Sequence, residues 1–298
     1  MTVAARSARR LEGAPFATEI RERVKADVAL YVESHGHPPG LAVVVCGRSA
    51  PSMVYLERIL KACAQVGIEG SMVDVPGDDA PTQSTELTAA IEHLHADARV
   101  AGIIVQMPLP AGVSLRTVVD AIDPLKDIDG IHPLNAGLLR LGYEGFVPAT
   151  AHAALEMIHQ SGVEVRGADA VVIGRSPVVG MPVAFLLTRE DATVTVCHSK
   201  TRDLAAKVRG ADIVVVAAGR PGLVTGAMLK PGAVVIDVGI NVVNGQIVGD
   251  VEFASAEQVA GAITPVPGGV GPLTNALLLN HLMRAAQRQD HAKEQFAV

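Results

Sequence analysis

A glycine-containing turn lies in the second half of this 298-residue chain, directly after an apolar run. Gly174 follows the apolar residues 171–173, and Ser176 and Gly180 come before the next helical pattern. Backbone N–H groups at the start of a helix bind phosphate, and glycines let a dinucleotide's pyrophosphate come close. Because the spacing is one residue longer than the usual Gly-x-Gly-x-x-Gly pattern, an ordinary glycine turn is the alternative interpretation.

The end of the next predicted strand favours a phosphorylated ribose. NAD-binding proteins commonly place an Asp or Glu about 20 residues beyond the first glycine, where it binds the ribose hydroxyls. This chain has His198, Ser199 and Lys200 instead. A 2′-phosphate would meet no carboxylate there, while Arg175 and Ser199 can donate hydrogen bonds to it and Lys200 can add charge. We therefore expect NADP as the cofactor, although a lone surface lysine is usually only a solvated charge.

Alternating strand and helix patterns must position these residues, which predicts an α/β fold with a doubly wound sheet in each half. In the first half we expect strands at 41–46, 68–75 and 102–106, and helices at 15–33, 52–66, 86–96 and 115–122. In the second half we expect strands at 168–173, 193–197, 213–218 and 233–238, and helices at 150–159, 181–187, 201–208 and 275–289. Residues 126–135 read as a long polar loop, a kind of segment that often carries function.

Composition excludes several classes of protein. A net charge of −6 and a pI near 5.9 disfavour nucleic-acid and membrane-surface partners, because both need a basic face. The apolar runs of four to eight residues are too short to span a membrane. Three cysteines outside any Cys/His cluster predict neither a disulfide nor a metal site, as in a reducing cytoplasm. Arg6, Arg9 and Arg10 faintly resemble a transit peptide, but we expect a frayed N-terminus.

Six segments spread over most of the chain form a set that is more specific than a single glycine turn. They are residues 105–110 (Val-Gln-Met-Pro-Leu-Pro), 126–130 (Lys-Asp-Ile-Asp-Gly), 174–182, 197–201 (Cys-His-Ser-Lys-Thr), 237–241 (Asp-Val-Gly-Ile-Asn) and 264–272 (Thr-Pro-Val-Pro-Gly-Gly-Val-Gly-Pro). In type and order they resemble the methylenetetrahydrofolate dehydrogenase/cyclohydrolases of folate one-carbon metabolism.

The resemblance implies two domains with a folate cleft between them. The folate-binding domain would comprise residues 1–149 with 274–298, and residues 150–273 would form the Rossmann-type NADP-binding domain. A tetrahydrofolate one-carbon derivative would be the substrate, and a cytoplasmic homodimer is the expected form. The resemblance places NADP contacts at Thr150, Gly174, Arg175, Ser176, Ser199 and Ile240. It places folate contacts at Ser52, Tyr55, Gln106, Asp129, Pro267, Gly268 and Gly269.

Tyr55, Gln106 and Asp129 are the expected catalytic positions. A carboxylate such as Asp129 can accept hydrogen bonds from the ring nitrogens of a pterin, and Tyr55 offers a flat apolar face with one polar tip. Each residue also has a plain structural interpretation. Tyr55 could be a half-buried helix residue, Gln106 a strand-end cap and Asp129 a turn former.

One position departs from the family pattern. The family reads Ser-x-x-Tyr-x-x-x-Lys, with Tyr and Lys four residues apart on one helical face, whereas this chain has Ile59 at the lysine position. That lysine is thought to manage protons when water adds to the methenyl carbon, and isoleucine can neither donate nor accept one. Arg58 lies about 100° back around the helix and Lys61 about 200° on, so neither is an easy substitute.

The two half-reactions should therefore suffer unequally. Hydride transfer needs alignment and a nearby nicotinamide, whereas losing a positioned acid or base typically costs about 10²–10⁴-fold. We expect NADP-dependent oxidation of 5,10-methylenetetrahydrofolate to 5,10-methenyltetrahydrofolate, with weak or absent cyclohydrolase activity. The alternatives are a fully bifunctional enzyme giving 10-formyltetrahydrofolate, a non-catalytic folate- or NADP-binding paralogue, and a related α/β dehydrogenase with another small substrate.

Overall fold

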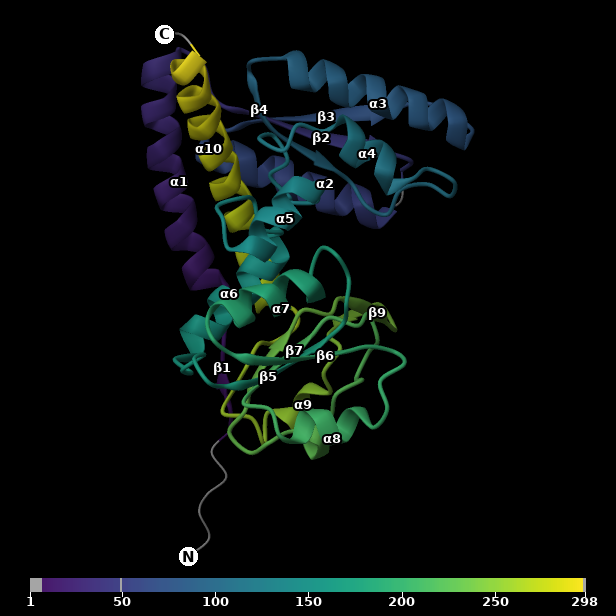
Figure 1. Cartoon of the computed structure of the whole chain (residues 1–298), viewed down its shortest axis with the longest axis vertical. Helices are drawn as coiled ribbons and strands as arrows, with labels where there is room; N and C mark the ends of the chain where they lie inside the picture. The colour runs from purple at the N-terminus through teal and green to yellow at the C-terminus, as the bar shows by residue number, and fades with distance from the viewer. Residues whose placement is uncertain (1–6, 49, 297–298) are drawn as a thin grey trace, which may run out of the picture. The chain divides into compact units, whose positions relative to one another are not determined.

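The computed structural model describes residues 7–48 and 50–296, which form two compact units, each built on its own parallel sheet (Figure 1). The three-stranded unit comprises Thr18–Leu138, Glu144–Val147 and residues 275–296. The six-stranded unit comprises residues 7–17, Leu139–Tyr143 and Pro148–Thr274. The two-domain α/β architecture expected from the sequence is confirmed. Within the described ranges, no helix is long and apolar enough to cross a membrane.

The three-stranded unit has the strand order β3-β2-β4, all parallel. Its strands are β2 (Gly40–Cys46), β3 (Glu69–Val75) and β4 (Val100–Val105). Its helices are α2 (Ala50–Val66), α3 (Ala80–Ala96), α4 (Leu115–Ala121) and most of α5 (Pro133–Leu141). Every residue of β2 and β4 is buried. Since β3 and β4 lie on opposite sides of β2, the strand order reverses there, and ligands of such sheets bind at the carboxyl ends of the strands at that point.

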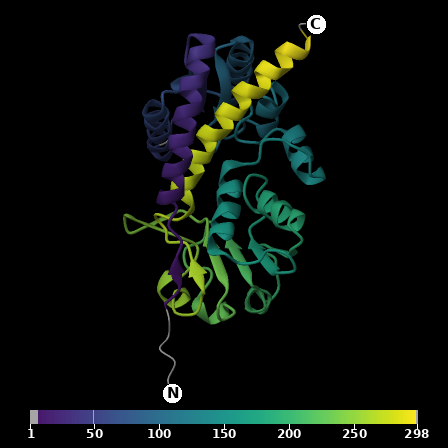
Figure 2. The ribbon, with the colours of Figure 1, turned by 90° about the vertical axis from the view of Figure 1, so that its left-hand side faces the viewer.

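Two long helices complete this unit. Most of α1 (Ala14–His35) and α10 (Val270–Phe296) belongs to it; they lie next to each other in Figure 1 and diverge at an angle in Figure 2. Between them His35 Nε2 lies 3.1 Å from Asp290 Oδ2. The last helix of the chain thus packs against the first.

The six-stranded unit is parallel throughout, in the order β1-β11-β8-β7-β5-β6. Its strands are β1 (Arg9–Arg10), β11 (Ala262–Ile263), β8 (Val234–Asp237), β7 (Ile213–Val216), β5 (Asp169–Ile173) and β6 (Thr193–Cys197). Its helical segments are α6 (Ala149–Ser161), α7 (Gly180–Arg189), α8 (Leu204–Arg209), the short 3₁₀ turn η1 (Gly226–Met228) and α9 (Phe253–Ala256). A separate hairpin joins β9 (Asn241–Val243) to β10 (Gln246–Val248). The order reverses between β5 and β7, which puts the expected dinucleotide crevice at their carboxyl ends.

The expected frayed N-terminus is wrong for the described part of that segment. Arg9 and Arg10 form an edge strand on β11, and the buried Leu11 donates its N–H to the Ile263 carbonyl at 2.8 Å. Arg9 Nη2 also donates to the carbonyls of Gln160 (2.9 Å) and Ser161 (2.5 Å) at the end of α6. Arg6 lies outside the described residues. The arginines therefore anchor a strand.

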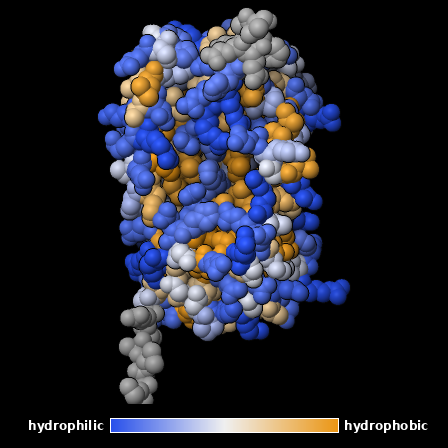
Figure 3. All heavy atoms as spheres, turned by 60° about the vertical axis from the view of Figure 1, so that its left-hand side comes forward, coloured by the Kyte–Doolittle hydropathy of each residue, from blue (hydrophilic) through white to orange (hydrophobic). Residues whose placement is uncertain are grey.

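The surface is mostly hydrophilic on the face that Figure 3 shows, with apolar residues appearing between the polar ones. Single exposed apolar side chains are normal in monomeric proteins. Ile240 and Val242 stand out because 71% and 74% of their surfaces are exposed, and both lie at the hairpin of β9 and β10.

Candidate functional site

Two glycines allow the close backbone packing of the turn after β5. Gly174 has a positive φ of 128° and donates its N–H to the Cys197 carbonyl at 2.9 Å. A Cβ at Gly174 would overlap the carbonyl oxygen of Ala217, and one at Gly180 would overlap the carbonyl oxygen of Gly174. The turn, the end of β6 and the segment after β7 can therefore meet only if both positions lack side chains.

The Ser176 hydroxyl accepts backbone hydrogen bonds at the beginning of α7. Ser176 Oγ accepts from the N–H groups of Val179 (3.1 Å) and Gly180 (3.4 Å). The N-cap residue, Val179, has no side-chain acceptor to offer. Ser176 Oγ thus accepts from these two N–H groups, and the positive end of the helix favours an anion such as a pyrophosphate beside the turn.

Positive charge gathers in the sequence around the tight turn after β6. Thr201 Oγ1 accepts from the His198 N–H at 2.8 Å, and His198 Nδ1 accepts from the Lys200 N–H at 3.1 Å. Ser199 and Lys200 are exposed, as is Arg202, which sequence reasoning missed. The sequence could have pointed to it, because Arg202 adds a second cation to residues 198–202, which contain no carboxylate, ahead of Asp203, the N-cap of α8.

The remaining expected cofactor residues also belong to the six-stranded unit. Arg175 is exposed beside the glycine turn, and Thr150 is partly exposed in the first turn of α6. Ile240 follows β8 at the carboxyl edge of the sheet. Within the described residues, neither Arg175 nor Lys200 forms an ion pair, so their charges are available to a phosphate.

In the three-stranded unit, two side chains of the Lys126–Gly130 segment, those of Lys126 and Asp127, hold the surrounding structure, and Asp129 is the candidate site residue. The buried Lys126 Nζ donates to three carbonyl oxygens at the end of α3, those of Leu94 (3.1 Å), His95 (2.8 Å) and Asp97 (2.8 Å). Its ammonium thus satisfies a helix end, which favours positive charge.

Asp127 supports the opposite side of the same segment. It is fully buried and accepts from the N–H groups of Ile131 (3.1 Å) and His132 (2.8 Å) and from Asn135 Nδ2 (2.8 Å). Asn135 also donates to the Pro124 carbonyl at 3.0 Å. The segment expected to be a long loop therefore passes into α5 from Pro133 onward, and Asp127 holds the entry to that helix.

Asp129 and Gln106 are brought to the same edge of the three-stranded sheet. Ile103 of β4 bridges Asp127 in parallel, so Asp129 lies level with the end of β4, which Gln106 follows. Gln106 is buried, and among the described residues no group accepts a hydrogen bond from its Nε2. A buried donor without a partner is costly, which makes Gln106 a candidate for binding a ligand.

The Asp129 carboxyl has an unusual protonation equilibrium. Desolvation by the surrounding protein raises its pKa to about 7, and the negative charge of Asp127 adds to the effect. Near neutral pH the group can therefore both donate and accept hydrogen bonds, which is useful for recognising a ring that carries N–H donors and nitrogen acceptors.

The other expected folate residues fall in three places. Ser52 and Tyr55 lie in α2, which begins at the carboxyl end of β2, but their side chains lie outside the described part of the structure. Ile59, also on α2, is 1% exposed. Pro267, Gly268 and Gly269 belong to the six-stranded unit, where the Gly269 N–H donates to the Pro265 carbonyl at 2.8 Å.

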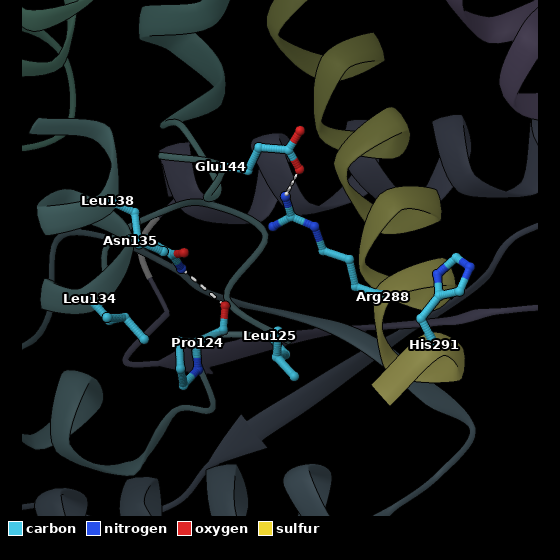
Figure 4. Close-up of a pocket in the computed structure, with 8 residues that line it drawn as sticks. All are labelled: Pro124, Leu125, Leu134, Asn135, Leu138, Glu144, Arg288 and His291. Carbon is cyan, nitrogen blue, oxygen red and sulfur yellow. Dashed lines mark hydrogen bonds and ion pairs between the residues drawn. The ribbon is translucent and has the colours of Figure 1, made fainter. Parts of the chain in front are cut away.

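A separate pocket of about 440 Å³ opens in the three-stranded unit (Figure 4). Leucine side chains and the polar Asn135, Glu144, Arg288 and His291 line it, and Arg288 Nη2 lies 3.2 Å from Glu144 Oε2. It contains neither Gln106 nor Asp129. It is linked to the site through Asn135, which donates to the Pro124 carbonyl in Figure 4 and also to Asp127.

Comparisons with known proteins identify both units. Residues 11–129 match the family model described as "Tetrahydrofolate dehydrogenase/cyclohydrolase, catalytic domain", and residues 148–290 match its "NAD(P)-binding domain". The chain is 47% identical over 297 residues to "Bifunctional protein FolD" of Rhodopirellula baltica, covering 95% of this chain and 98% of that protein. It is 49% identical over 283 residues to the protein of the same name from Bordetella avium, with coverage of 95% and 98%.

Solved structures of FolD proteins are similar to this chain over nearly its whole length. The Campylobacter jejuni "Bifunctional Enzyme FolD" superimposes with a TM-score of 0.90 at 38% identity, covering 95% of this chain and all of that one. The FolD of Trypanosoma brucei, complexed with NADP cofactor and inhibitor, gives a TM-score of 0.90 at 38% identity, with coverage of 95% and 99%.

Proposed function

This chain belongs to the tetrahydrofolate dehydrogenase/cyclohydrolase family, and we propose that it is an NADP-dependent 5,10-methylenetetrahydrofolate dehydrogenase with weak or absent cyclohydrolase activity. The reaction moves a hydride from the methylene carbon of the folate to the nicotinamide, giving 5,10-methenyltetrahydrofolate. The nicotinamide supplies the hydride chemistry when it is bound. The residues of this chain contribute binding, alignment and control of protons.

The carboxylate-free, cationic turn after β6 is the observation that carries the choice of NADP. Among the described residues, neither Lys200 on this turn nor Arg175 on the turn after β5 forms an ion pair. The positive end of α7 favours the negative charge of the pyrophosphate. We assign cofactor contacts to Thr150, Gly174, Arg175, Ser176, Ser199 and Ile240. The six-stranded unit would then be the NADP-binding domain and the three-stranded unit the folate-binding domain. The compact units depart from the expected bounds, 150–273 and 1–149 with 274–298, because residues 7–17 and Leu139–Tyr143 pack with the six-stranded unit.

Gln106 and Asp129 are our candidates for orienting the pterin. The unpartnered Gln106 Nε2 would donate to an acceptor on the ligand, and Asp129 would exchange hydrogen bonds with the ring nitrogens. Ser52, Tyr55, Pro267, Gly268 and Gly269 are proposed to complete the folate site. Holding the ring in one register places its reacting carbon for transfer.

The absence of a proton carrier at Ile59 underlies the proposed loss of hydrolysis. Adding water to the methenyl carbon requires proton transfer at a fixed position, and a buried isoleucine offers neither a donor nor an acceptor. The product would then be methenyltetrahydrofolate, which hydrolyses slowly or passes to another enzyme.

One assay tests this proposal. The purified protein is mixed with methylenetetrahydrofolate and NADP, and NADPH and the methenyl chromophore are recorded together. We expect NADPH formation with accumulating methenyl product. Rapid loss of the methenyl signal above the buffer rate would instead support the bifunctional enzyme, which the names of the curated relatives favour. No NADPH formation would support a non-catalytic paralogue.

We also propose that the chain works as a cytoplasmic homodimer. The exposed Val242, Val243 and Ile247 put apolar surface on both strands of the hairpin, a feature that often marks a protein contact. Light scattering on the purified protein should give twice the mass of 30.9 kDa. Val242→Asp should shift the mass toward the monomer, and a monomeric wild type would contradict the proposal.

A further inference from the structure

Two buried aspartates link the loops at the carboxyl edge of the six-stranded sheet. Asp237 ends β8, and Asp250 follows β10. They are 4% and 0% exposed. Neither belongs to the cofactor contacts proposed above, and burying a carboxylate is costly unless hydrogen bonds compensate.

Asp250 receives four hydrogen bonds, three of them from one backbone turn. Its Oδ2 accepts from the N–H groups of Ala218 (2.6 Å) and Gly219 (2.8 Å), and its Oδ1 accepts from the N–H of Arg220 at 2.8 Å. Oδ1 also accepts from Asn241 Nδ2 at 2.8 Å. The Asp250 carboxylate thus binds both the loop after β7 and Asn241, the residue that follows Ile240.

Asp237 in turn holds the backbone that carries Asp250. Its Oδ1 accepts from the N–H groups of Gly239 (2.9 Å) and Asp250 (3.0 Å), and its Oδ2 accepts from that of Val251 (2.8 Å). The packing is reciprocal, because a Cβ at Gly239 would overlap the Asp250 carboxylate and one at Gly249 would overlap the Asp237 carboxylate. Neither aspartate can shift without moving the other.

The turn that Asp250 holds reaches the glycine turn of the cofactor site. The Ala217 carbonyl oxygen lies directly against Gly174, so residues 217–220 form one wall beside the expected pyrophosphate position. The loops after β5 and β7 are also the pair that borders the reversal of strand order. Asp250 therefore connects that wall with Ile240.

We propose that Asp250 is a positioning residue for the dinucleotide, which fixes the 217–220 turn and Ile240 in their binding geometry, with Asp237 holding Asp250 in place. The proposal rests on the NADP-binding function argued above. It assigns the two aspartates to cofactor affinity through backbone geometry, without direct contact with the cofactor.

The test is Asp250→Asn, which keeps the size of the side chain but replaces one accepting oxygen by a donating NH₂. That group would face N–H donors and release at least part of the turn. We expect the dissociation constant of NADPH, measured from the fluorescence of the bound cofactor, to rise about 10- to 100-fold, and the KM for NADP to rise with it. The KM for methylenetetrahydrofolate should change less than threefold.

Asp212→Asn is the matched control. Asp212 accepts from Lys230 Nζ and from the Asp169 N–H at the opposite edge of the same sheet, so its loss perturbs the unit away from the cofactor. We expect a lower melting temperature with NADPH affinity retained. If Asp250→Asn does not fold, Asn241→Ala is the second test. It removes a single donor to Asp250, and we expect it to weaken NADPH binding about threefold to tenfold.

Wild-type protein that fails to bind NADPH would overturn the proposed function and this inference together. Wild-type protein that binds NADPH, with Asp250→Asn or Asn241→Ala binding equally well, would overturn the inference alone. Equal losses of affinity in Asp250→Asn and Asp212→Asn would also overturn it, because the effect would then be general destabilisation.

Discussion

Ile59 is the residue at which folding and chemistry make opposite demands. Its side chain is 1% exposed, so isoleucine is well suited to the position as packing. A lysine there would have to bury its stem and place its ammonium within reach of the substrate. The residue that removes a proton carrier is thus also one that stabilises α2.

Ile59→Lys should gain hydrolysis and lose stability. An uncompensated buried charge costs about 3–5 kcal/mol, and burial lowers the pKa of the introduced amine. We expect clearance of methenyltetrahydrofolate to increase about tenfold or more over wild type, with a lower melting temperature. Ile59→Met, which is similar in volume and carries no proton, is the control. Equal gains in both variants would refute a proton-transfer role for this position.

Asp129 should make the stability of the protein depend on pH. Its folded pKa of about 7 lies above the ordinary value of 3.8, so the folded state binds the proton more tightly. Stability from this group is therefore present below about pH 4 and is lost as the pH rises through 7.

Asp129→Asn removes this dependence. At pH 8 we expect the free energy of unfolding of the variant to exceed that of wild type by about 2–4 kcal/mol, so the variant is more stable. We also expect it to lose folate affinity. Urea unfolding at pH 5 and pH 8 measures the difference, with the exposed Asp78→Asn as control. A variant less stable than wild type at pH 8 would show that Asp129 is paired as a carboxylate in solution.

Individual residues were predictable from the sequence where the chemistry is local. The glycine turn and the cationic turn after β6 follow from residue types alone, because backbone and charge requirements act over a few residues. The partners of Asp250 could not be foreseen, since its carboxylate meets Ala218 across 32 positions of the chain. Only the folded sheet brings these segments together.

Among the elements, α3 illustrates how a distant lysine can end a helix. Lys126 donates to the carbonyl oxygens of Leu94 and His95 at the helix end, and to that of Asp97, which also accepts from the Val100 N–H at 3.2 Å. Lys126→Met keeps the apolar stem and removes all three donors. We expect a loss of about 2–4 kcal/mol in the free energy of unfolding. Lys61→Met, an exposed change in the same unit, should cost less than about 0.5 kcal/mol.

Strands and helices with strong periodicity were predicted to within a few residues, and weakly patterned ones were missed. Helix α3 begins at Ala80, well before the predicted start, because Asp79 Oδ1 accepts from the Thr82 N–H at 2.9 Å and forms an N-cap. The edge strands β1 and β11 have two residues each, too few for a pattern. Their structure comes from pairing with each other and with β8.

For the molecule as a whole, two compact units predict separable responses to ligands. NADP alone should slow amide hydrogen exchange around the 174–180, 199–202 and 217–220 segments. At 100 times its dissociation constant it should add about 2.7 kcal/mol of stability. Segments 103–106 and 126–131 should keep their exchange rates until a folate is added. Protection of those segments by NADP alone would show that the cofactor acts on both units.

The route of the chain between the two units bears on its synthesis. The six-stranded unit includes residues 7–17, and the three-stranded unit is completed by residues from 275 onward. A nascent chain that has left the ribosome as far as Leu138 therefore carries β1 without β11 and the three-stranded sheet without α10. Bare strand edges and uncovered apolar faces invite aggregation. Neither unit can complete its fold until residues 262–296 have been synthesised, so we expect the unfinished chain to expose surfaces of the kind that chaperones bind.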